Sequence, residues 1–499
     1  MPTMHRLLAL ATIALVLAAP NAYAQTALPR ALLDRAARAM GGAQALDSLR
    51  NKTIDFNTVG FAIGQEETPD GPPRATLSFG RTVTDYAGTR RLTTQDVRAV
   101  NGMNSRQRRV SLATMSMIET NGALAMDPAS VPAGLERALS LQLERVLLAA
   151  SHHESATSPL RSKVIRGEMA DGIRVILGPD TASLWFDRAS GLPIALETLT
   201  DDGVLGDRRT VTLFGRWQDA GGLALPRQID VEVNGRLQSH TVITAATVND
   251  QLADSLFIIP DSMKAKAPTL PNTANSSTPA PVEVPLVSIA PGVWRAEGAN
   301  HFSLVVEQGP GLLVIEAPLS SARSNAVLDT LRKRFPGRPV TAVVMTHHHH
   351  DHSGGIRGYM ARGIRVIAHQ RNREFVREVA SARKTVAPDR LSRGAPAPVS
   401  IAVRDSLVLG SGQGRVVVYP VPSAHAKGIL AAWVPSAGIV FTSDVLSPQA
   451  NQPISPTGSR EMVAFAKSVG IAPTRFVGGH GVPVEWSAVE GAGKGEHRD

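Results

Sequence analysis

The chain has no cysteine, and phenylalanine, tyrosine and tryptophan together make up only 4% of it. Without cysteine there is no disulfide framework and no thiol to carry a lipid anchor behind a signal peptide. So few aromatic rings leave few surfaces on which bases could stack. The net charge of +9 is spread along the chain without a block of like charge, and we therefore expect no nucleic-acid partner.

The first residues have the pattern of a secretory signal. His5 and Arg6 supply a short positive region, an apolar run follows from Leu7 to Ala19, and small residues flank Tyr23 before Gln25. The apolar run is too short for a stable membrane span. We expect residues 1–24 to be a Sec-type signal peptide cleaved near Ala24. The mature protein is then expected in the periplasm or outside a bacterial cell, without a transmembrane segment.

Residues 25–261 predict an α+β domain built on a curved antiparallel sheet. The 499 residues are 43% hydrophobic and 19% charged, which suffices for two or three domains with cores. Short runs alternate apolar and polar residues at period two, and turn dipeptides such as Asn234-Gly235 separate them at hairpin intervals. A helix is expected from Ala133 to Ala150, where one apolar stripe consists of Leu135, Leu139, Leu143 and Leu147.

The end of this domain resembles periplasmic half-barrel domains related to the lipoprotein-carrier fold. The resemblance rests on Trp217 to Pro226, Ile229 to Val233 and the Asn234-Gly235 turn. It implies a concave sheet that holds an apolar ligand. The alternative is a sheet whose inner face is filled by the Ala133–Ala150 helix.

Residues 262–282 are rich in alanine, proline, serine and threonine, which predicts a linker because such a segment buries little apolar surface. Residues 283–499 then alternate strand and helix patterns. Such an order predicts a layered α/β domain with two small sheets between helix layers.

A histidine run follows the apolar strand Val340 to Met345. Within it, His347, His349, Asp351 and His352 form the pattern H-x-H-x-D-H, in which His348 and His350 are spacers. Neutral imidazoles and carboxylates are the ligands that zinc takes in proteins. The alternative is a solvated low-complexity tract, but this run is internal, follows an apolar strand and is closed by Gly354-Gly355 and a helical pattern.

Three further residues of metal-ligating type stand just past later apolar strands. His425 follows Val416 to Val421, Asp444 follows Ile439 to Thr442, and His480 follows a strand that ends near Val477. Any one of them alone is more often a structural residue than a ligand. We expect them to meet the histidine run at a common edge because all stand at strand ends.

Together these residues resemble the metallo-β-lactamase fold superfamily across the whole C-terminal domain. The resemblance implies an αββα sandwich that binds two zinc ions, with iron or manganese as the alternatives. It implies His347, His349 and His425 on the first metal, Asp351, His352 and His480 on the second, and Asp444 on both. A hydroxide shared by the metals would attack the substrate, and Asp351 or Asp444 would shuttle the proton.

The aspartate at position 444 limits the classes of reaction that we expect. In the superfamily's β-lactamases this place usually holds cysteine or serine, whereas a bridging aspartate is typical of lactonases, thioesterases, phosphodiesterases and alkylsulfatases. We expect an exported dinuclear zinc hydrolase that cleaves an ester, lactone or related bond of a small-molecule substrate, lipophilic if the N-terminal domain binds it.

Three alternatives stay open. The first is a β-lactamase-type amide hydrolase. The second is an iron-loaded oxidoreductase of the persulfide-dioxygenase kind. The third is a binding protein for an apolar ligand in which the metal domain is a scaffold. The sequence indicates no oligomeric state.

Overall fold

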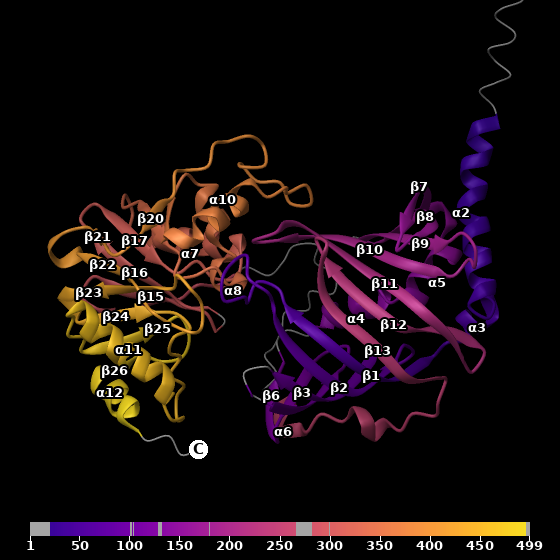
Figure 1. Ribbon diagram of the computed structural model, residues 1–499, viewed down its shortest axis with the longest axis horizontal. Coiled ribbons are helices and arrows are strands. Elements are labelled where there is room, and N and C mark those ends of the chain that lie inside the picture. Colours follow the sequence, from indigo (N-terminus) through magenta and orange to yellow (C-terminus); the bar gives the residue numbers. More distant parts are fainter. Residues whose placement is uncertain are drawn as a thin grey trace, which may run out of the picture. The chain divides into compact units, whose positions relative to one another are not determined.

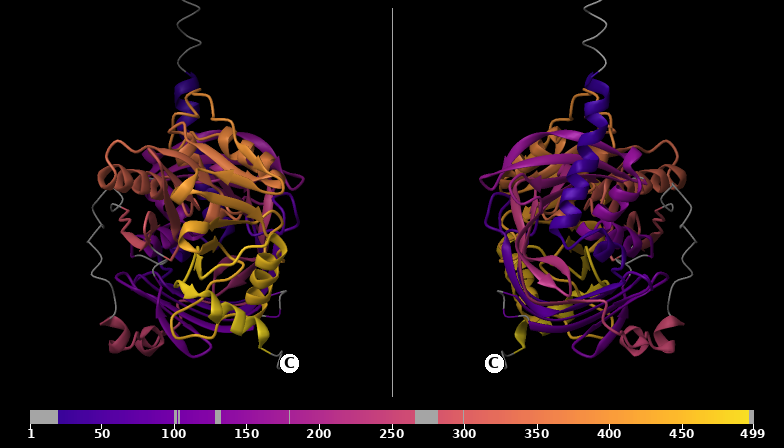
Figure 2. Two further views of the ribbon diagram at one scale, coloured as in Figure 1. Left: turned by 90° about the vertical axis from the view of Figure 1, so that its left-hand side faces the viewer. Right: turned by 90° about the vertical axis from the view of Figure 1, so that its right-hand side faces the viewer.

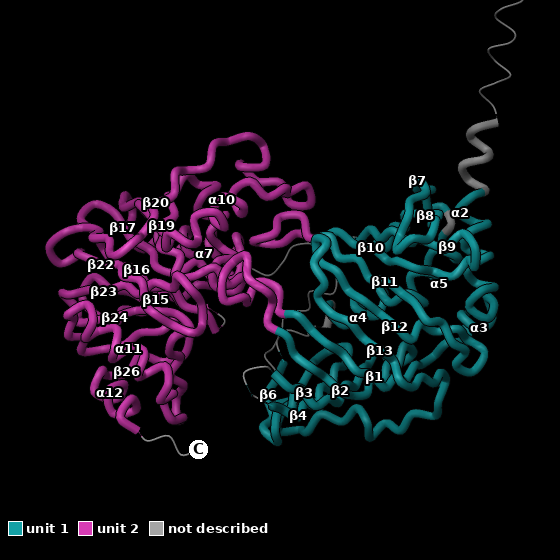
Figure 3. The backbone as a smooth tube through the Cα atoms, in the orientation of Figure 1, with its two compact units in different colours: residues 1–61, 75–199, 209–279 teal, residues 62–74, 200–208, 280–499 magenta. Residues whose placement is uncertain are grey.

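The computed structural model describes residues 20–99, 102, 104–127, 132–178, 180–265, 282–298 and 300–495, which form two compact units (Figures 1 and 3). Unit 2 contains Ala62–Arg74, Thr200–Arg208 and the described residues after Ala280, and unit 1 contains the rest. The two short segments come from within the stretch that the sequence assigns to the N-terminal domain. Both segments nevertheless belong to unit 2, although each connects two strands of the unit 1 sheet.

Two expected segments fall wholly or largely outside the described residues. Of the expected signal peptide, only Pro20 to Ala24 are described, as the start of helix α2 (Pro20–Ala39). Of the expected linker, the described part includes the end of helix α6 (Asp261–Lys264). None of the helices in the described part of the chain combines the length and the hydropathy of a membrane span.

Unit 1 is built on one antiparallel sheet of 13 strands, counted over the described residues, in the order β6-β5-β4-β3-β2-β1-β13-β12-β11-β10-β9-β8-β7. Neighbours in the chain are neighbours in the sheet, and the pairing of β1 with β13 joins the two halves. The Asn234-Gly235 turn connects β12 to β13 with positive φ at both residues, as the sequence predicts. The strands are β1 (Asn51–Ala62), β2 (Arg74–Asp85), β3 (Arg90–Ala99), β4 (Asn104–Ser111), β5 (Ser116–Thr120), β6 (Ala123–Met126), β7 (Thr157–Ile165), β8 (Glu168–Leu177), β9 (Asp180–Asp187), β10 (Pro193–Asp202), β11 (Gly206–Ala220), β12 (Leu223–Val233) and β13 (Arg236–Val248).

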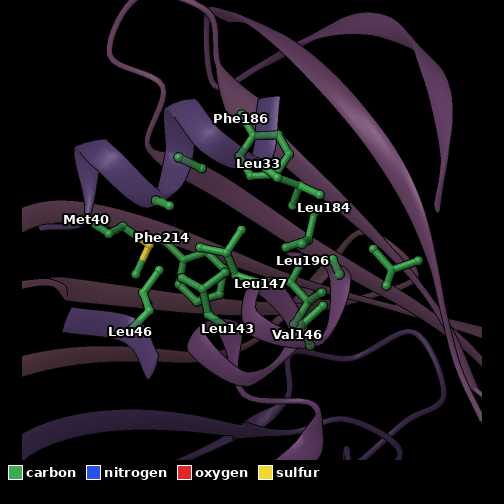
Figure 4. Close-up of a cluster of buried hydrophobic side chains, with 14 of the residues drawn as sticks. Leu33, Met40, Leu46, Leu143, Val146, Leu147, Leu184, Phe186, Leu196 and Phe214 are labelled. Atoms are coloured by element: carbon green, nitrogen blue, oxygen red, sulfur yellow. The ribbon is translucent and has the colours of Figure 1, made fainter. Parts of the chain in front are cut away.

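Helices pack against this curved sheet (Figure 2). The single helix expected from Ala133 to Ala150 is instead two helices, α4 (Pro132–Ser140) and α5 (Leu143–His152), beside α2 and the short α3 (Ala43–Asp47). The expected leucine stripe is buried along both helices. Figure 4 shows side chains of α2 and α5 packed on strand residues such as Phe186 and Phe214. The α5 helix therefore fills part of the sheet's inner face.

Over its described residues, unit 2 is a sandwich of a 7-stranded and a 6-stranded sheet. The first sheet runs β14 (Leu286–Ala290), β15 (Val293–Ala296), β16 (Ser303–Gln308), β17 (Gly311–Ile315), β18 (Val340–Val344), β19 (Arg365–His369) and β20 (Ile401–Val403). The second runs β21 (Leu407–Leu409), β22 (Val416–Pro420), β23 (Leu430–Val434), β24 (Ile439–Thr442), β25 (Arg475–Gly478) and β26 (Val484–Glu485). Buried apolar side chains of both sheets form the core between them.

Helices cover the outer face of each sheet of unit 2. Apolar side chains of α7 (Ser321–Arg334), α9 (Ile356–Met360) and α10 (Arg373–Ser381) share a core with the first sheet. Those of α11 (Pro456–Val469) and α12 (Trp486–Lys494) share a core with the second. These four layers confirm the αββα sandwich that the sequence predicts. Strands β17 to β20 pair in parallel, as do β24 and β25, so the residues that follow them gather at shared edges.

Candidate metal centre

The histidine run turns directly from strand β18 into the short helix α8 (His350–Ser353). The run is not a solvated tract, because His347, His349 and His352 have no exposed surface. The Ser353 hydroxyl donates to the carbonyl oxygens of His348 and His349 at 3.0 and 2.9 Å, which holds the turn together. The serine that closes the sequence motif therefore fixes the backbone that carries the rings.

One group of ligand-type atoms comes from His347, His349, His425 and Asp444, whose atoms all lie within 4.8 Å of one another. His425 Nε2 is 3.0 Å from His349 Nδ1. His347 Nε2 is buried and has no hydrogen-bond partner among the described residues. A buried polar nitrogen without a partner is costly, and a metal held by the three rings would supply one.

A second group includes Asp351, His352 and Asp444. His352 Nε2 lies 3.5 Å from Asp351 Oδ2 and 3.2 Å from His480 Nε2. The Asp444 carboxylate stands between the two groups: its Oδ2 is 2.9 Å from His352 Nε2 and 3.2 Å from His425 Nε2. Its Oδ1 is 3.3 Å from His480 Nε2. The structure thus brings together all seven residues that the sequence proposes as ligands.

Three of these rings, those of His352, His480 and His347, have their other nitrogen engaged by a partner behind them. Glu316 Oε1 is 2.5 Å from His352 Nδ1, the Asn300 carbonyl oxygen is 2.5 Å from His480 Nδ1, and Thr346 Oγ1 is 3.1 Å from His347 Nδ1. Such partners fix the orientation of a ligating imidazole and the nitrogen it presents.

Glu316 is not among the site residues predicted from the sequence. It is fully buried and directly follows strand β17, and its φ of 82° lies in the left-handed region. Its amide donates to the Val344 carbonyl at 2.8 Å, which holds this uncommon backbone conformation in place. Glu316 is a carboxylate just past an apolar strand, which is the same pattern that identifies Asp444. The sequence pattern could therefore have predicted Glu316 as well.

His301 and His369 take different places, and neither is among the seven residues that the sequence proposes as ligands. The His301 ring centroid is 4.2 Å from that of His480, and its Nε2 is 3.5 Å from Asp351 Oδ2. His369 Nδ1 instead accepts from the Arg371 amide at 3.1 Å. His301 therefore lies in the candidate centre, and His369 caps a turn beside it.

The histidines differ in their affinity for protons. Burial lowers the pKa of His347 well below its ordinary value and lowers the pKa of His349 to about 3. Burial also disfavours the charged form of His352, but the carboxylates of Glu316 and Asp444 raise its pKa to about 10. His347 and His349 are thus neutral, as metal ligands must be, and His352 would lose its extra proton to solvent when a metal binds.

Both carboxylates are anionic. Burial opposes the charge on Asp444, yet hydrogen bonds from His352, His425 and His480 hold its pKa far below the usual range. Burial likewise opposes the charge on Asp351, and the neighbouring His301 and His352 lower its pKa. Imidazoles around a pair of carboxylates form a donor set that fits two divalent metal ions.

The part of the chain that carries the candidate metal centre is similar to known proteins. Residues 297–482 match the family model of the metallo-β-lactamase superfamily. The chain is 31% identical to a linear primary-alkylsulfatase of Pseudomonas sp over 74 residues, 15% of this chain and 11% of the relative. It is 28% identical to a hydroxyacylglutathione hydrolase of Cereibacter sphaeroides over 148 residues, 30% of this chain and 48% of the relative. The chain thus spans less than half the length of these relatives.

A solved structure of a metallo-β-lactamase from Pontibacter korlensis aligns with 42% of this chain and 96% of its own, at 15% identity and a TM-score of 0.34. The family match and the four-layer sandwich agree with the resemblance read from the motif. The C-terminal region is a metallo-β-lactamase domain.

Proposed function

We propose that this protein is an exported dinuclear zinc hydrolase that cleaves an ester, lactone or related bond. The observation that carries the proposal is the position of Asp444, whose two oxygens reach histidine nitrogens of both groups within 3.3 Å. A carboxylate held in this way suits a bridge between two cations. The names of the relatives support the choice of bond, because they include an alkylsulfatase and a hydroxyacylglutathione hydrolase.

The ligand set divides along the two groups. His347, His349 and His425 would hold the first zinc, and Asp351, His352 and His480 the second. When bound, the metals supply a Lewis acid for the substrate oxygen and lower the pKa of water. The protein's own part is to hold these donors in place, to keep His347 and His349 neutral, and to keep the carboxylates charged.

Asp351 is the better placed of the two carboxylates to take up a proton. Its side chain is 39% exposed, whereas that of Asp444 is 16% exposed and is hydrogen-bonded to three rings. His301 Nε2 lies 3.5 Å from Asp351 Oδ2, where it can orient the carboxylate. We assign proton transfer to Asp351 and bridging to Asp444.

A hydrolysis panel tests the proposal. The purified protein, loaded with zinc, is offered an acyl lactone, an alkyl sulfate, a phosphodiester and a cephalosporin. We expect turnover of the lactone or the sulfate, and its loss in His349→Ala and in Asp444→Ala. Full activity in either variant, or turnover of the cephalosporin alone, would contradict the proposal.

A specific observation favours a second candidate function, binding of an apolar ligand by unit 1. A cavity of about 320 Å³ lies between α5 and the sheet, lined by apolar side chains such as Leu196 and Phe214. Lys52, Arg91 and Glu144 also line it, and Arg91 Nε is buried without a hydrogen-bond partner among the described residues. An apolar molecule with an anionic group fits this lining.

The cavity is tested with a fluorescent fatty acid. We expect the full-length protein to bind it and Leu196→Trp, which fills the cavity, to bind it at least tenfold more weakly. Equal binding by both proteins, or no binding by either, would exclude this second function.

A further inference from the structure

The connection between β1 and β2 belongs to the unit that carries the metal centre. Ala62–Arg74, here named the 62–74 segment, is part of unit 2, although both strands that it joins belong largely to the sheet of unit 1. Its middle is shielded from solvent, because Gly64 and Glu66 are buried. A buried hairpin connection is unusual, since most connections lie on the surface.

One backbone carbonyl of the segment contacts two rings of the histidine run. The Glu66 carbonyl oxygen is 2.8 Å from His349 Nε2 and 3.0 Å from His348 Nε2. A carbonyl oxygen only accepts hydrogen bonds, so Nε2 carries the proton in both rings. The tautomer of His349 is thereby set, and its Nδ1 faces His425 Nε2 without a proton.

A side chain of the segment contacts the carboxylate of the same run. Gln65 Nε2 donates to Asp351 Oδ1 at 2.7 Å. The other oxygen, Oδ2, faces His352 Nε2 at 3.5 Å. With Oδ1 held by an amide, Asp351 presents Oδ2 to the group that includes His352 and Asp444.

Further contacts fix the segment against the turns that carry the candidate ligands. The His350 amide donates to the Gly64 carbonyl at 3.1 Å, the Lys427 amide donates to the Glu67 carbonyl at 2.7 Å, and the Arg74 guanidinium donates to the His425 carbonyl. Gly64 has a φ of +84°, and a Cβ there would lie 2.4 Å from the His350 ring. Only glycine fits this close approach.

We propose that the 62–74 segment is a positioning element of the metal centre: the Glu66 carbonyl sets the tautomer of His349, and Gln65 orients Asp351. The inference rests on the proposed metal site and extends it to residues that lie more than 270 positions before the histidine run. Outer partners of this kind affect metal affinity about 10-fold to 100-fold when they are removed.

The role of Gln65 is tested with Gln65→Met, which keeps the length of the side chain and removes the donor. Asp70→Asn is the matched control, because Asp70 is an exposed residue of the same segment. Both are compared with the wild type by zinc competition against a chromophoric chelator and by the absorption spectrum of the cobalt-substituted protein. Thermal unfolding of each variant shows that it folds.

We expect Gln65→Met to bind the second zinc at least about 10-fold more weakly and to alter the cobalt spectrum. The affinity for the first zinc should be unchanged. Asp70→Asn should match the wild type. Wild-type affinities and spectrum in Gln65→Met, or an equal weakening of both metals, would overturn the role of Gln65. A wild type that binds no metal would instead overturn the proposed function and the inference together.

The role of the Glu66 carbonyl is tested with Gly64→Ala, which displaces it. Gly235→Ala is the control, because Gly235 has a φ of +82° and a Cβ there would meet nothing within 4 Å. Nitrogen NMR of the metal-free proteins reads the tautomer of His349. We expect the Nε2-protonated form in the wild type and in Gly235→Ala, its loss in Gly64→Ala, and about 10-fold weaker binding of the first zinc there. A Nδ1-protonated His349 in the wild type would overturn the assignment.

Discussion

At the scale of single residues, the candidate metal centre consists of groups behind the candidate ligands as well as the ligands themselves. His352 has Glu316 on one nitrogen and Asp444 on the other. The seven proposed ligand residues could be identified from the sequence because each stands just past an apolar strand. The Glu66 carbonyl could not, since a backbone acceptor is present at every position and leaves no signal in the sequence.

Replacing Glu316 by glutamine should weaken the binding of the second metal ion. The amide keeps the shape of the side chain but removes the charge that favours a strongly polarised His352 ring, and we expect about 10-fold weaker zinc binding. Competition with a chelator measures this in Glu316→Gln and in the wild type. Equal affinity in the two proteins would show that Glu316 does not support His352.

At the scale of elements, the helix that follows the histidine run is tied to its neighbour by one buried arginine. Arg357 in α9 donates to the carbonyl oxygens of Val379 and Ala380 near the end of α10, at 2.6 and 3.1 Å. It also donates to both oxygens of Asp389, at 2.6 and 3.1 Å. Arg357 thus joins the start of α9 to the end of α10.

The Arg357 and Asp389 pair predicts a specific acid sensitivity. Burial opposes the charge on Asp389, but the hydrogen bonds from Arg357 lower its pKa to about 2. A carboxyl group whose pKa is depressed in the folded state stabilises the fold above its unfolded pKa, near 4, and loses this contribution as pH falls toward 2.

We therefore expect the pair to contribute about 2 kcal/mol at neutral pH. Asp389→Asn should lose most of this at pH 7 and should show a flatter pH dependence of the unfolding free energy between pH 4 and 2. Urea unfolding at several pH values measures both proteins. Parallel curves for the two would refute the linkage.

Elements were predicted well where apolar periodicity defines them, and less well where the chain breaks or changes partner. The strand under the histidine run ends within a residue of its expected end. The leucine stripe from Leu135 to Leu147 correctly shows which face is buried, but a stripe cannot show that the chain breaks between α4 and α5. Nor does the composition of the 62–74 segment reveal that it belongs to unit 2, because tertiary contacts decide this.

At the scale of the whole molecule, the sequence predicts two domains that follow one another along the chain. The contacts in the structure instead assign two segments of the expected N-terminal domain to unit 2. Besides the 62–74 segment, Thr200–Arg208 belongs to unit 2, where the Lys384 ammonium pairs with Asp201 and the Thr385 hydroxyl donates to Asp207. A chain limited to residues 283–499 would lack both segments. Two segments from within the expected N-terminal domain therefore belong to the unit that carries the candidate metal centre.

Export is a prediction for the whole chain. If residues 1–24 are a cleaved signal, protein expressed in a bacterial host should be found in the periplasm or the medium, with Gln25 as its first residue. Mass spectrometry of the purified protein reads this directly. A cytoplasmic product that retains its first 24 residues would contradict it.

The metal content of the purified protein and of three alanine variants of the histidine run decides whether the proposed dinuclear site exists. We predict about two zinc ions per wild-type chain. His348→Ala and His350→Ala should retain at least one metal, and His347→Ala should not retain a working pair. A wild type that holds iron or no metal, or a His347→Ala variant with the full zinc content and activity of the wild type, would contradict the proposed dinuclear zinc site.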